Sequence, residues 1–365
     1  MEERNKAKDV FLKSQTNADH IKYKKLRNNT LKMQRADKSK WVTGMLGENG
    51  NNSKKIWRTV KTVSGDLKRA TISKIITNGV SLTKKSEIVE ELNNAFIEKI
   101  KDIKENLPMP ETNLLSKLKN IKSPTDNVLQ PLEISEAELN KIIKEMKKNT
   151  SCGPDSINAI VLGDIFPTIK RTLLHLVNLS LCSGTFPSIY KTTKIIPIVK
   201  IGKNPCFASS YRPISNTSTI GKIIERCVTG RMMSHIKEHM ILNKNHHGGI
   251  SKHSTTTCIL QILDDTKNNL EKNKKTAIMA IDLSSAYDLV DHDILIEKSR
   301  LMSVGKTCTI WLKNFLSKRS QFVELDGTKS QTIQCGSEGV VQGGPSSGEL
   351  FVIFLNSLPI TQFQL

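Results

Sequence analysis

The most informative stretch of the sequence is Ala277-Ile278-Met279-Ala280-Ile281-Asp282-Leu283-Ser284-Ser285-Ala286-Tyr287-Asp288. The run before Asp282 is apolar and too short for a helix, so it predicts a buried strand that ends in a carboxylate. Burying a carboxylate is unfavourable unless the group is paired or binds a cation. Asp282 is therefore expected either to cap the turn after the strand or to act as an oxygen ligand for a metal ion.

The pattern D-x-x-x-A-Y-D alone favours the capping role, because aspartates are common at strand ends. The metal-binding role suits a different chemistry. Phosphoryl and nucleotidyl transfer assisted by Mg²⁺ use hard oxygen ligands held at the edge of a rigid sheet. The choice between the two roles depends on the other segments of the chain.

Composition narrows the class of protein. The chain has 365 residues, enough for two or three domains, and its 55 Lys and Arg outnumber 35 Asp and Glu for a net charge of +20. Such an excess favours a polyanionic partner, nucleic acid before membrane. The seven scattered cysteines form no C-x-x-C pair, which argues against a zinc knuckle or a secreted disulfide framework. Without a signal peptide or a transmembrane run, the chain is expected to be intracellular, in the cytoplasm, the nucleus or both.

The N-terminal segment is the most basic part of the chain, with 19 Lys or Arg against 7 acids in residues 1–75. Residues 1–40 contain neither glycine nor proline, which permits one long helix there, followed by a loop over 44–53 and a helix over 54–63. A basic helix of this kind can lie along a phosphate backbone, and the candidate contacts are Lys22, Lys24, Lys25 and Arg27. The alternative is a solvated linker without a partner.

Apolar periodicity and capping signals predict the remaining elements. Helices are expected over 81–103, over 135–150 behind a Ser135-x-x-Glu138 capping box, before Gly184, over 219–241, from Ser254 or Thr255, and over 293–302, 308–316 and 350–355. Residues 194–200 predict a strand that Pro197 places at an edge or in an irregular pairing, and Asp326-Gly327 predicts a hairpin turn. Trp311 and Phe315 are expected in the core, and His246, His247 and His253 in a loop.

In order and spacing, these segments resemble the reverse transcriptase of non-LTR retrotransposons, in particular the jockey-like, LINE-type group. The matching segments are Cys152-Gly153-Pro154-Asp155-Ser156-Ile157, Gly184-Thr185-Phe186-Pro187, Tyr211-Arg212-Pro213-Ile214-Ser215, Lys222-Ile223-Ile224-Glu225, His247-Gly248, Ser254-Thr255-Thr256-Thr257, Asp282–Asp288, Val341-Gln342-Gly343, Leu350-Phe351 and Leu358-Pro359. Their common order favours the metal-binding role for Asp282.

The resemblance implies an α+β fold, the fingers and an incomplete palm of a right-hand polymerase. It assigns 1–107 to a basic helical N-terminal extension, 108–131 to a linker, 132–252 to the fingers, and 253–365 to a palm with an antiparallel sheet and flanking helices. The implied reaction is RNA-templated DNA synthesis from deoxynucleoside triphosphates on a DNA primer, with two Mg²⁺ ions. An RNA template and a DNA primer are thus the implied partners.

The resemblance also implies roles for individual residues. Asp282 would be the catalytic, metal-binding aspartate, with the main-chain carbonyl of Leu283 as a second metal ligand. Tyr287 would exclude a ribose 2′-hydroxyl, and Lys200 and Arg212 would bind the triphosphate. The other residues expected in the nucleotide pocket are Ser285, Ala286, Gln342 and Gly343.

The chain also departs from the pattern of this group. The Ala-Asp-Asp motif expected after the Leu-Pro segment is missing, as is a thumb, and Asp288 and Asp291 are not ligands in the family. Because two-metal catalysis needs several carboxylates, the chain is expected to be a truncated fragment that is inactive alone. The alternative is a non-catalytic RNA- or DNA-binding remnant of a mobile element. A group II intron-like maturase is a third possibility, although no maturase segment is recognisable.

Overall fold

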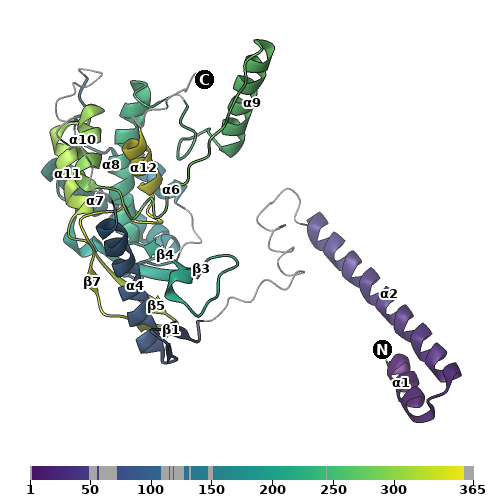
Figure 1. Cartoon of the computed structure of the whole chain (residues 1–365). Coiled ribbons are helices and arrows are strands. Elements are labelled where there is room, and N and C mark those ends of the chain that lie inside the picture. Colours follow the sequence, from purple (N-terminus) through teal and green to yellow (C-terminus); the bar gives the residue numbers. More distant parts are fainter. Residues whose placement is uncertain are drawn as a thin grey trace. The chain divides into compact units, whose positions relative to one another are not determined.

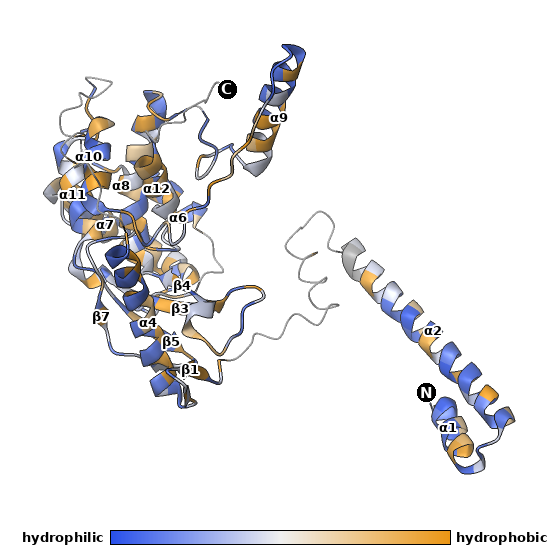
Figure 2. Cartoon of the chain, viewed as in Figure 1, coloured by the Kyte–Doolittle hydropathy of each residue, from blue (hydrophilic) through white to orange (hydrophobic). Residues whose placement is uncertain are grey.

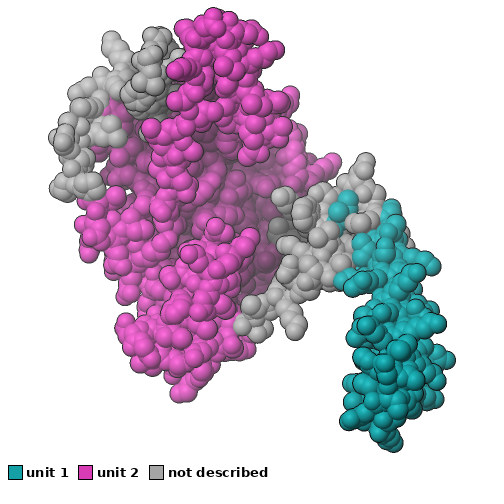
Figure 3. Space-filling model, turned by 45° about the vertical axis from the view of Figure 1, so that its right-hand side comes forward, with its two compact units in different colours: residues 1–71 teal, residues 72–365 magenta. Residues whose placement is uncertain are grey.

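The computed structural model describes residues 2–48, 56, 72–107, 115, 118, 127–130, 133–146, 151–243 and 245–356. The chain divides into two compact units, Met1–Thr71 and Ile72–Leu365 (Figure 3). The helix expected over 54–63 is described only at Ile56, which is helical. Most of the expected 108–131 linker and the Leu358-Pro359 segment lie outside the described residues.

Residues 2–48 of the first unit form two helices, α1 (Glu2–Ser14) and α2 (Asn17–Glu48), where the sequence permits one long helix over residues 1–40 (Figure 1). The single helix was a wrong prediction because Thr16 supplies a cap. The Asp19 amide donates to the Thr16 hydroxyl oxygen at 3.3 Å. The chain reverses at Gln15, whose φ is +48°, and the Phe11 ring then stacks on His20 at 4.8 Å.

Helix α2 presents mainly polar and charged side chains (Figure 2). Lys22, Lys24, Lys25 and Arg27 are all exposed on it. The helix also runs to Glu48, so residues 44–48 are helical where the sequence predicts a loop. The described part of the first unit is therefore a helical pair with an exposed basic surface.

The second unit is built around a five-stranded sheet in the order β4 (Tyr211–Asn216), β3 (Thr192–Val199), β5 (Ser320–Leu325) and β6 (Thr328–Lys329), with β7 (Ile333–Gln334) also paired to β5. Strand β3 is antiparallel to β4 and parallel to β5. The expected combination of helices and sheet is confirmed. The sheet is mixed rather than antiparallel because β5 runs in the direction of β3.

Two local predictions in this sheet had different outcomes. The Asp326-Gly327 hairpin turn between β5 and β6 is confirmed, with φ values of +48° and +84°. Of the two alternatives for Pro197, the edge strand is wrong, because β3 lies between β4 and β5, and the irregular pairing is confirmed. Of the residues of β3, strand β5 pairs with Thr192–Ile195 only. Pro197 lies beyond that pairing and faces Pro213 of β4. The missing proline N–H therefore interrupts no ladder with β5.

Helix α4 (Lys85–Glu105) covers one face of this sheet and follows a small hairpin of β1 (Ile75–Thr77) and β2 (Val80–Leu82). Its stripe of Ile88, Leu92 and Phe96 is buried, as predicted. It packs with Ile195, Tyr211 and Val323 in a second hydrophobic cluster. Asn93 is buried and donates to the Ser330 hydroxyl oxygen at 3.0 Å. Residues 72–107 thus share a core with the sheet.

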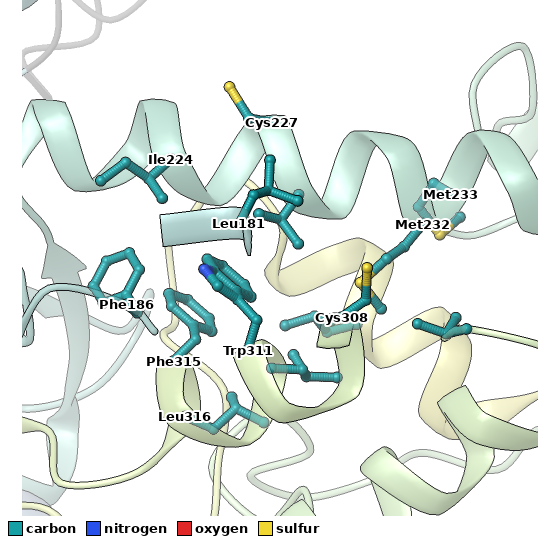
Figure 4. Packing of buried hydrophobic residues seen from close by; sticks show 14 of the residues in the cluster. Leu181, Phe186, Ile224, Cys227, Met232, Met233, Cys308, Trp311, Phe315 and Leu316 are labelled. Atoms are coloured by element: carbon teal, nitrogen blue, oxygen red, sulfur yellow. The ribbon is translucent and has the colours of Figure 1, made fainter. Parts of the chain in front are cut away.

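A larger hydrophobic core lies among the helices α6 (Glu136–Glu145), α7 (Ala159–Ser183), α8 (Thr219–Glu238), α10 (His292–Leu301), α11 (Lys306–Leu316) and α12 (Ser347–Leu355). A short 3-10 turn, η1 (Ser188–Tyr190), precedes β3, and a second one, η2 (Ala208–Ser210), precedes β4. The Ser135 capping box is confirmed, and Gly184 ends α7 with a φ of +64°. Trp311 is fully buried and stacks on Phe315 at 5.2 Å (Figure 4), so both core predictions are confirmed.

The strand expected over residues 277–281 is not formed, which corrects the central secondary-structure prediction. Ile278, Met279 and Ile281 are 67%, 81% and 79% exposed. They follow α9 (Thr255–Glu271), which contains no buried residue. The physical reason is the lack of a partner strand. β3 is flanked on both sides, and the Ser215 amide of β4 is already used by the Gln342 carbonyl at 2.8 Å.

The segment that begins at Cys152 is held tightly against the residues that follow β4. The Asn216 side-chain amide donates to the Cys152 carbonyl oxygen at 2.6 Å, and the Ser218 hydroxyl donates to the Asp155 carboxylate at 2.6 Å. A Cβ added at Gly153 would lie 2.5 Å from the Thr217 carbonyl oxygen. Two motifs that are distant in the sequence thus meet through backbone contact, which only glycine permits.

We expect Gly153→Ala to lower the free energy of unfolding by about 1–3 kcal/mol, because the added methyl group must displace backbone atoms. Gly163→Ala is the matched control. Its Cβ would meet nothing within 4 Å on α7, and alanine favours the helix by about 1 kcal/mol. Urea denaturation of both variants measures the difference. Equal stability of the two variants would contradict the close contact at Gly153.

Candidate nucleotide-binding site and nucleic-acid surface

Asp282 lies in an exposed segment without regular structure, just before the turn at 284–289. Within the part of the chain that the structure describes, its carboxylate has no hydrogen-bond or ion-pair partner. The capping role that the bare pattern favoured is therefore not used here. The carboxylate is free for a cation or for a partner molecule.

The turn that follows Asp282 contains three of the predicted nucleotide-binding residues, Ser285, Ala286 and Tyr287. Ser285 has a φ of +53°, and its carbonyl oxygen accepts from the Asp288 amide at 2.9 Å. The ring of Tyr287 stacks on Phe351 of α12 at 4.9 Å, next to the helical core. This contact fixes the ring and leaves the tyrosine half-buried. Ala286 lies between them, also half-buried.

Gln342 and Gly343 are held by the same framework. The Gln342 carbonyl accepts from the Ser215 amide at 2.8 Å, and Gly343, with a φ of +108°, would place a Cβ 2.9 Å from the Ser215 carbonyl oxygen. The Val340 amide donates to the Tyr287 carbonyl at 2.8 Å. The structure therefore brings together the 284–289 turn, the glycine-rich loop and β4.

Lys200 and Arg212 lie in a group of cations that also includes Lys99 and Lys203. The pKa of Lys200 is lowered by burial and further by the nearby charges of Lys99, Arg212 and Lys203. The Lys200 ammonium donates to the Ser209 carbonyl oxygen at 2.6 Å. Among the described residues, none of the four forms a salt bridge. We refer to Lys99, Lys200, Lys203 and Arg212 as the cationic group.

A cavity of about 510 Å³ lies between α4, the sheet and the loop at 335–342. Its walls include Lys99, Ser209, Asp288, Arg319 and Gln342. Burial raises the pKa of Asp288, and the Lys99 charge acts against that rise. Arg319 is 7% exposed and donates to the Phe315 carbonyl at 3.1 Å. Lys99 is thus the member of the cationic group that lines the cavity, together with Gln342 of the predicted nucleotide-binding loop.

Glu225 is a buried carboxylate whose role the sequence did not reveal. It accepts from the Ser346 amide at 3.1 Å and from the Ser346 hydroxyl, and thus fastens α8 to the start of α12. Burial raises its pKa, while the Ser346 hydrogen bonds and the charges of Arg319 and Lys222 oppose the rise. The only sequence signal was its place at the end of the Lys222–Glu225 motif.

The residues present do not fit a site for two metal ions. Among the described residues, no group of three or more His, Cys, Asp or Glu side chains could hold a metal ion. Asp282 offers one carboxylate, with the Leu283 carbonyl adjacent in sequence, whereas Mg²⁺ pairs in polymerases need several carboxylates. His247 is occupied by hydrogen bonds to Thr257 at 2.9 Å and Gln261 at 2.7 Å.

Comparison with known proteins identifies the class of this domain. A family model described as reverse transcriptase (RNA-dependent DNA polymerase) matches residues 201–362. This span contains β4, α8, Asp282 and the glycine-rich loop. Residues 201–362 are therefore a reverse transcriptase domain.

Individual relatives narrow this class further. The chain is 26% identical over 253 residues to the RNA-directed DNA polymerase from mobile element jockey of Drosophila funebris, an alignment that covers 68% of this chain and 27% of that protein. The corresponding protein of Drosophila melanogaster is 27% identical over 240 residues, or 66% of this chain and 26% of that protein. The probable RNA-directed DNA polymerase from transposon BS of Drosophila melanogaster is 26% identical over 242 residues, again 66% of this chain and 26% of that protein.

The reverse transcriptase domain is thus homologous to the RNA-directed DNA polymerases of non-LTR retrotransposons, which confirms the resemblance seen in the sequence. The chain spans about a quarter of the length of the curated relatives it matches. In the described residues, no helix has the length and apolar character needed to cross a membrane.

We expect Glu225→Gln to change the pH dependence of stability. Because the folded state raises the pKa of Glu225, the unfolded chain ionises first, and the unaltered protein loses stability as the pH rises above about 4.3. The variant lacks this loss. Its free energy of unfolding in urea denaturation, relative to that of the unaltered protein, should therefore rise as the pH increases above about 4.3.

Glu136→Gln is the control with the opposite sign. The hydrogen bond and charge of Lys170 lower the pKa of Glu136, so its replacement should remove a small stabilisation as the pH rises. If the free energies of unfolding of Glu225→Gln and the unaltered protein differ by the same amount at every pH, the raised pKa of Glu225 is contradicted.

Proposed function

We propose that this domain serves RNA-templated DNA synthesis and binds an RNA template, a DNA primer and a deoxynucleoside triphosphate. The observation that carries the proposal is the assembly of the Asp282 turn, the Gln342 loop and the cationic group around β4. Homology of the domain to RNA-directed DNA polymerases supports the same role. In this proposal, residues 132–252 are the fingers, 253–365 belong to the palm and 1–107 extend the nucleic-acid surface.

The chain's own residues would act on the nucleotide by binding and exclusion. Lys200 and Arg212 are proposed to bind the triphosphate, because free cations beside a cavity match a polyphosphate. The main-chain groups of Ser285 and Ala286 would line the sugar and phosphate side of the pocket. Tyr287, fixed by its stack on Phe351, is proposed to exclude a ribose 2′-hydroxyl. Gln342 and Gly343 would complete the pocket.

Asp282 is proposed as a metal-binding aspartate, with the Leu283 carbonyl as an accessory ligand. Bound Mg²⁺ would supply electrostatic stabilisation of phosphate charge. Asp282 alone holds at most one ion rather than two. For this reason the second candidate function, a domain that binds nucleic acid without chemistry, is favoured for the chain acting alone.

We expect the purified chain with Mg²⁺ to bind an RNA–DNA primer–template but to extend no primer, because the two-ion mechanism needs more carboxylates than Asp282 supplies. Primer extension with radiolabelled primer and all four deoxynucleoside triphosphates tests this directly. Extension that disappears in Asp282→Asn, with primer–template binding unchanged, would show that the chain catalyses the reaction by itself. Absence of any binding would contradict the proposed function.

We expect the basic surface of α2 to contribute to RNA binding by the full chain. Replacing Lys22, Lys24, Lys25 and Arg27 together with alanine should weaken binding to single-stranded RNA and reduce the salt slope by up to about 3, since each lost phosphate contact removes about 0.7. A filter-binding titration at several salt concentrations measures both quantities.

The control for this variant changes the same four side chains but keeps their positive charges. Its substitutions are Lys22→Arg, Lys24→Arg, Lys25→Arg and Arg27→Lys. It should keep the affinity and the salt slope, because contacts to phosphate depend mainly on charge. An alanine variant with an unchanged slope would support the alternative that α2 is a solvated linker.

A further inference from the structure

Helix α4 lies outside the span of the reverse transcriptase match, yet one of its side chains reaches the predicted nucleotide-binding turn. The ammonium of Lys99 donates to the Ser285 hydroxyl oxygen at 2.7 Å. The helix is held in this position by its buried stripe on the sheet, in particular Leu92 and Phe96. The position of Lys99 beside Ser285 therefore follows from the core of the unit.

Lys99 also lines the cavity that contains Asp288 and Gln342 on other walls. Its charge lowers the pKa of Lys200, the first of the cationic neighbours that do so. Like charges held this close repel one another, and in the described residues no acid forms a salt bridge with Lys99 or Lys200. A polyanion bound among them would remove this repulsion.

We propose that Lys99 of helix α4 binds the triphosphate of the incoming deoxynucleotide together with Lys200 and Arg212. The hydrogen bond to Ser285 places the ammonium at the turn where the phosphates would lie. This inference rests on the proposed function, because it presumes a nucleotide beside the 284–289 turn. It extends the site to a helix about a hundred residues before the matched span begins.

A purely structural role of Lys99 would have different consequences. The side chain is exposed, and among the described residues its hydrogen bond is to the Ser285 hydroxyl group, so its removal should leave the buried contacts of α4 in place. If Lys99 only supported the turn, its loss would weaken binding of a nucleoside with and without phosphates alike. A direct phosphate contact predicts a loss confined to phosphorylated ligands.

The test uses the full chain with Mg²⁺ and 2-aminopurine deoxynucleoside triphosphate, whose fluorescence reports binding. We expect Lys99→Ala to weaken binding about ten- to a hundredfold, the effect of one charge-assisted hydrogen bond. Lys99→Arg should retain most of the affinity. Lys141→Ala, which removes an exposed lysine from α6, is the matched control and should bind as the unaltered protein does.

Two further measurements separate the possible outcomes. Inorganic tripolyphosphate should displace the probe from the unaltered protein at lower concentration than from Lys99→Ala, while binding of 2-aminopurine deoxynucleoside should be equal in both. If Lys200→Ala weakens triphosphate binding and Lys99→Ala does not, the inference is wrong and the proposed function stands. If the unaltered protein binds no triphosphate, both are wrong. Circular dichroism of each variant verifies folding.

Discussion

A buried carboxylate holds the second unit together. Glu225, in the middle of α8, accepts two hydrogen bonds from Ser346 at the start of α12. A charged or protonated carboxyl group in the core is tolerated only where its oxygens are satisfied, so the contact requires Ser346 to stay where it is. This requirement positions the end of the glycine-rich loop against α8, and the remaining loop contacts depend on that position.

From this anchor the loop is fixed at several more places. Gly343 approaches the Ser215 carbonyl more closely than any side chain would permit, and Val340 donates to the Tyr287 carbonyl. The loop therefore joins β4 to the turn after Asp282. The glycines matter because backbone lies against backbone there, which explains a glycine-rich loop without appeal to flexibility. The arrangement of the loop, β4 and the turn after Asp282 thus rests on main-chain contacts first and on side chains second.

Asp282 itself shows how much a strand depends on its neighbours. The apolar run before it has the composition of a buried strand, but it pairs with no strand of the described sheet, and its side chains remain exposed. Apolar residues alone do not make a strand, because the backbone N–H and C=O groups also need partners. The cationic group is the converse case. Its four residues are distant in the sequence, and the fold brings their charges close enough to lower the pKa of Lys200.

Local signals in the sequence determined most of the helices, because caps, glycine stops and apolar stripes act within a few residues. Ser135 with Glu138, Gly184 and the Ile88 to Phe96 stripe are examples. The order of motifs also determined the class of the domain. Only the tertiary structure decided that Pro197 lies in a central strand, that β5 runs parallel to β3, and that Glu225 binds Ser346. It also decided that Lys99 meets Ser285, since contacts between residues so far apart in sequence depend on packing that no local pattern records.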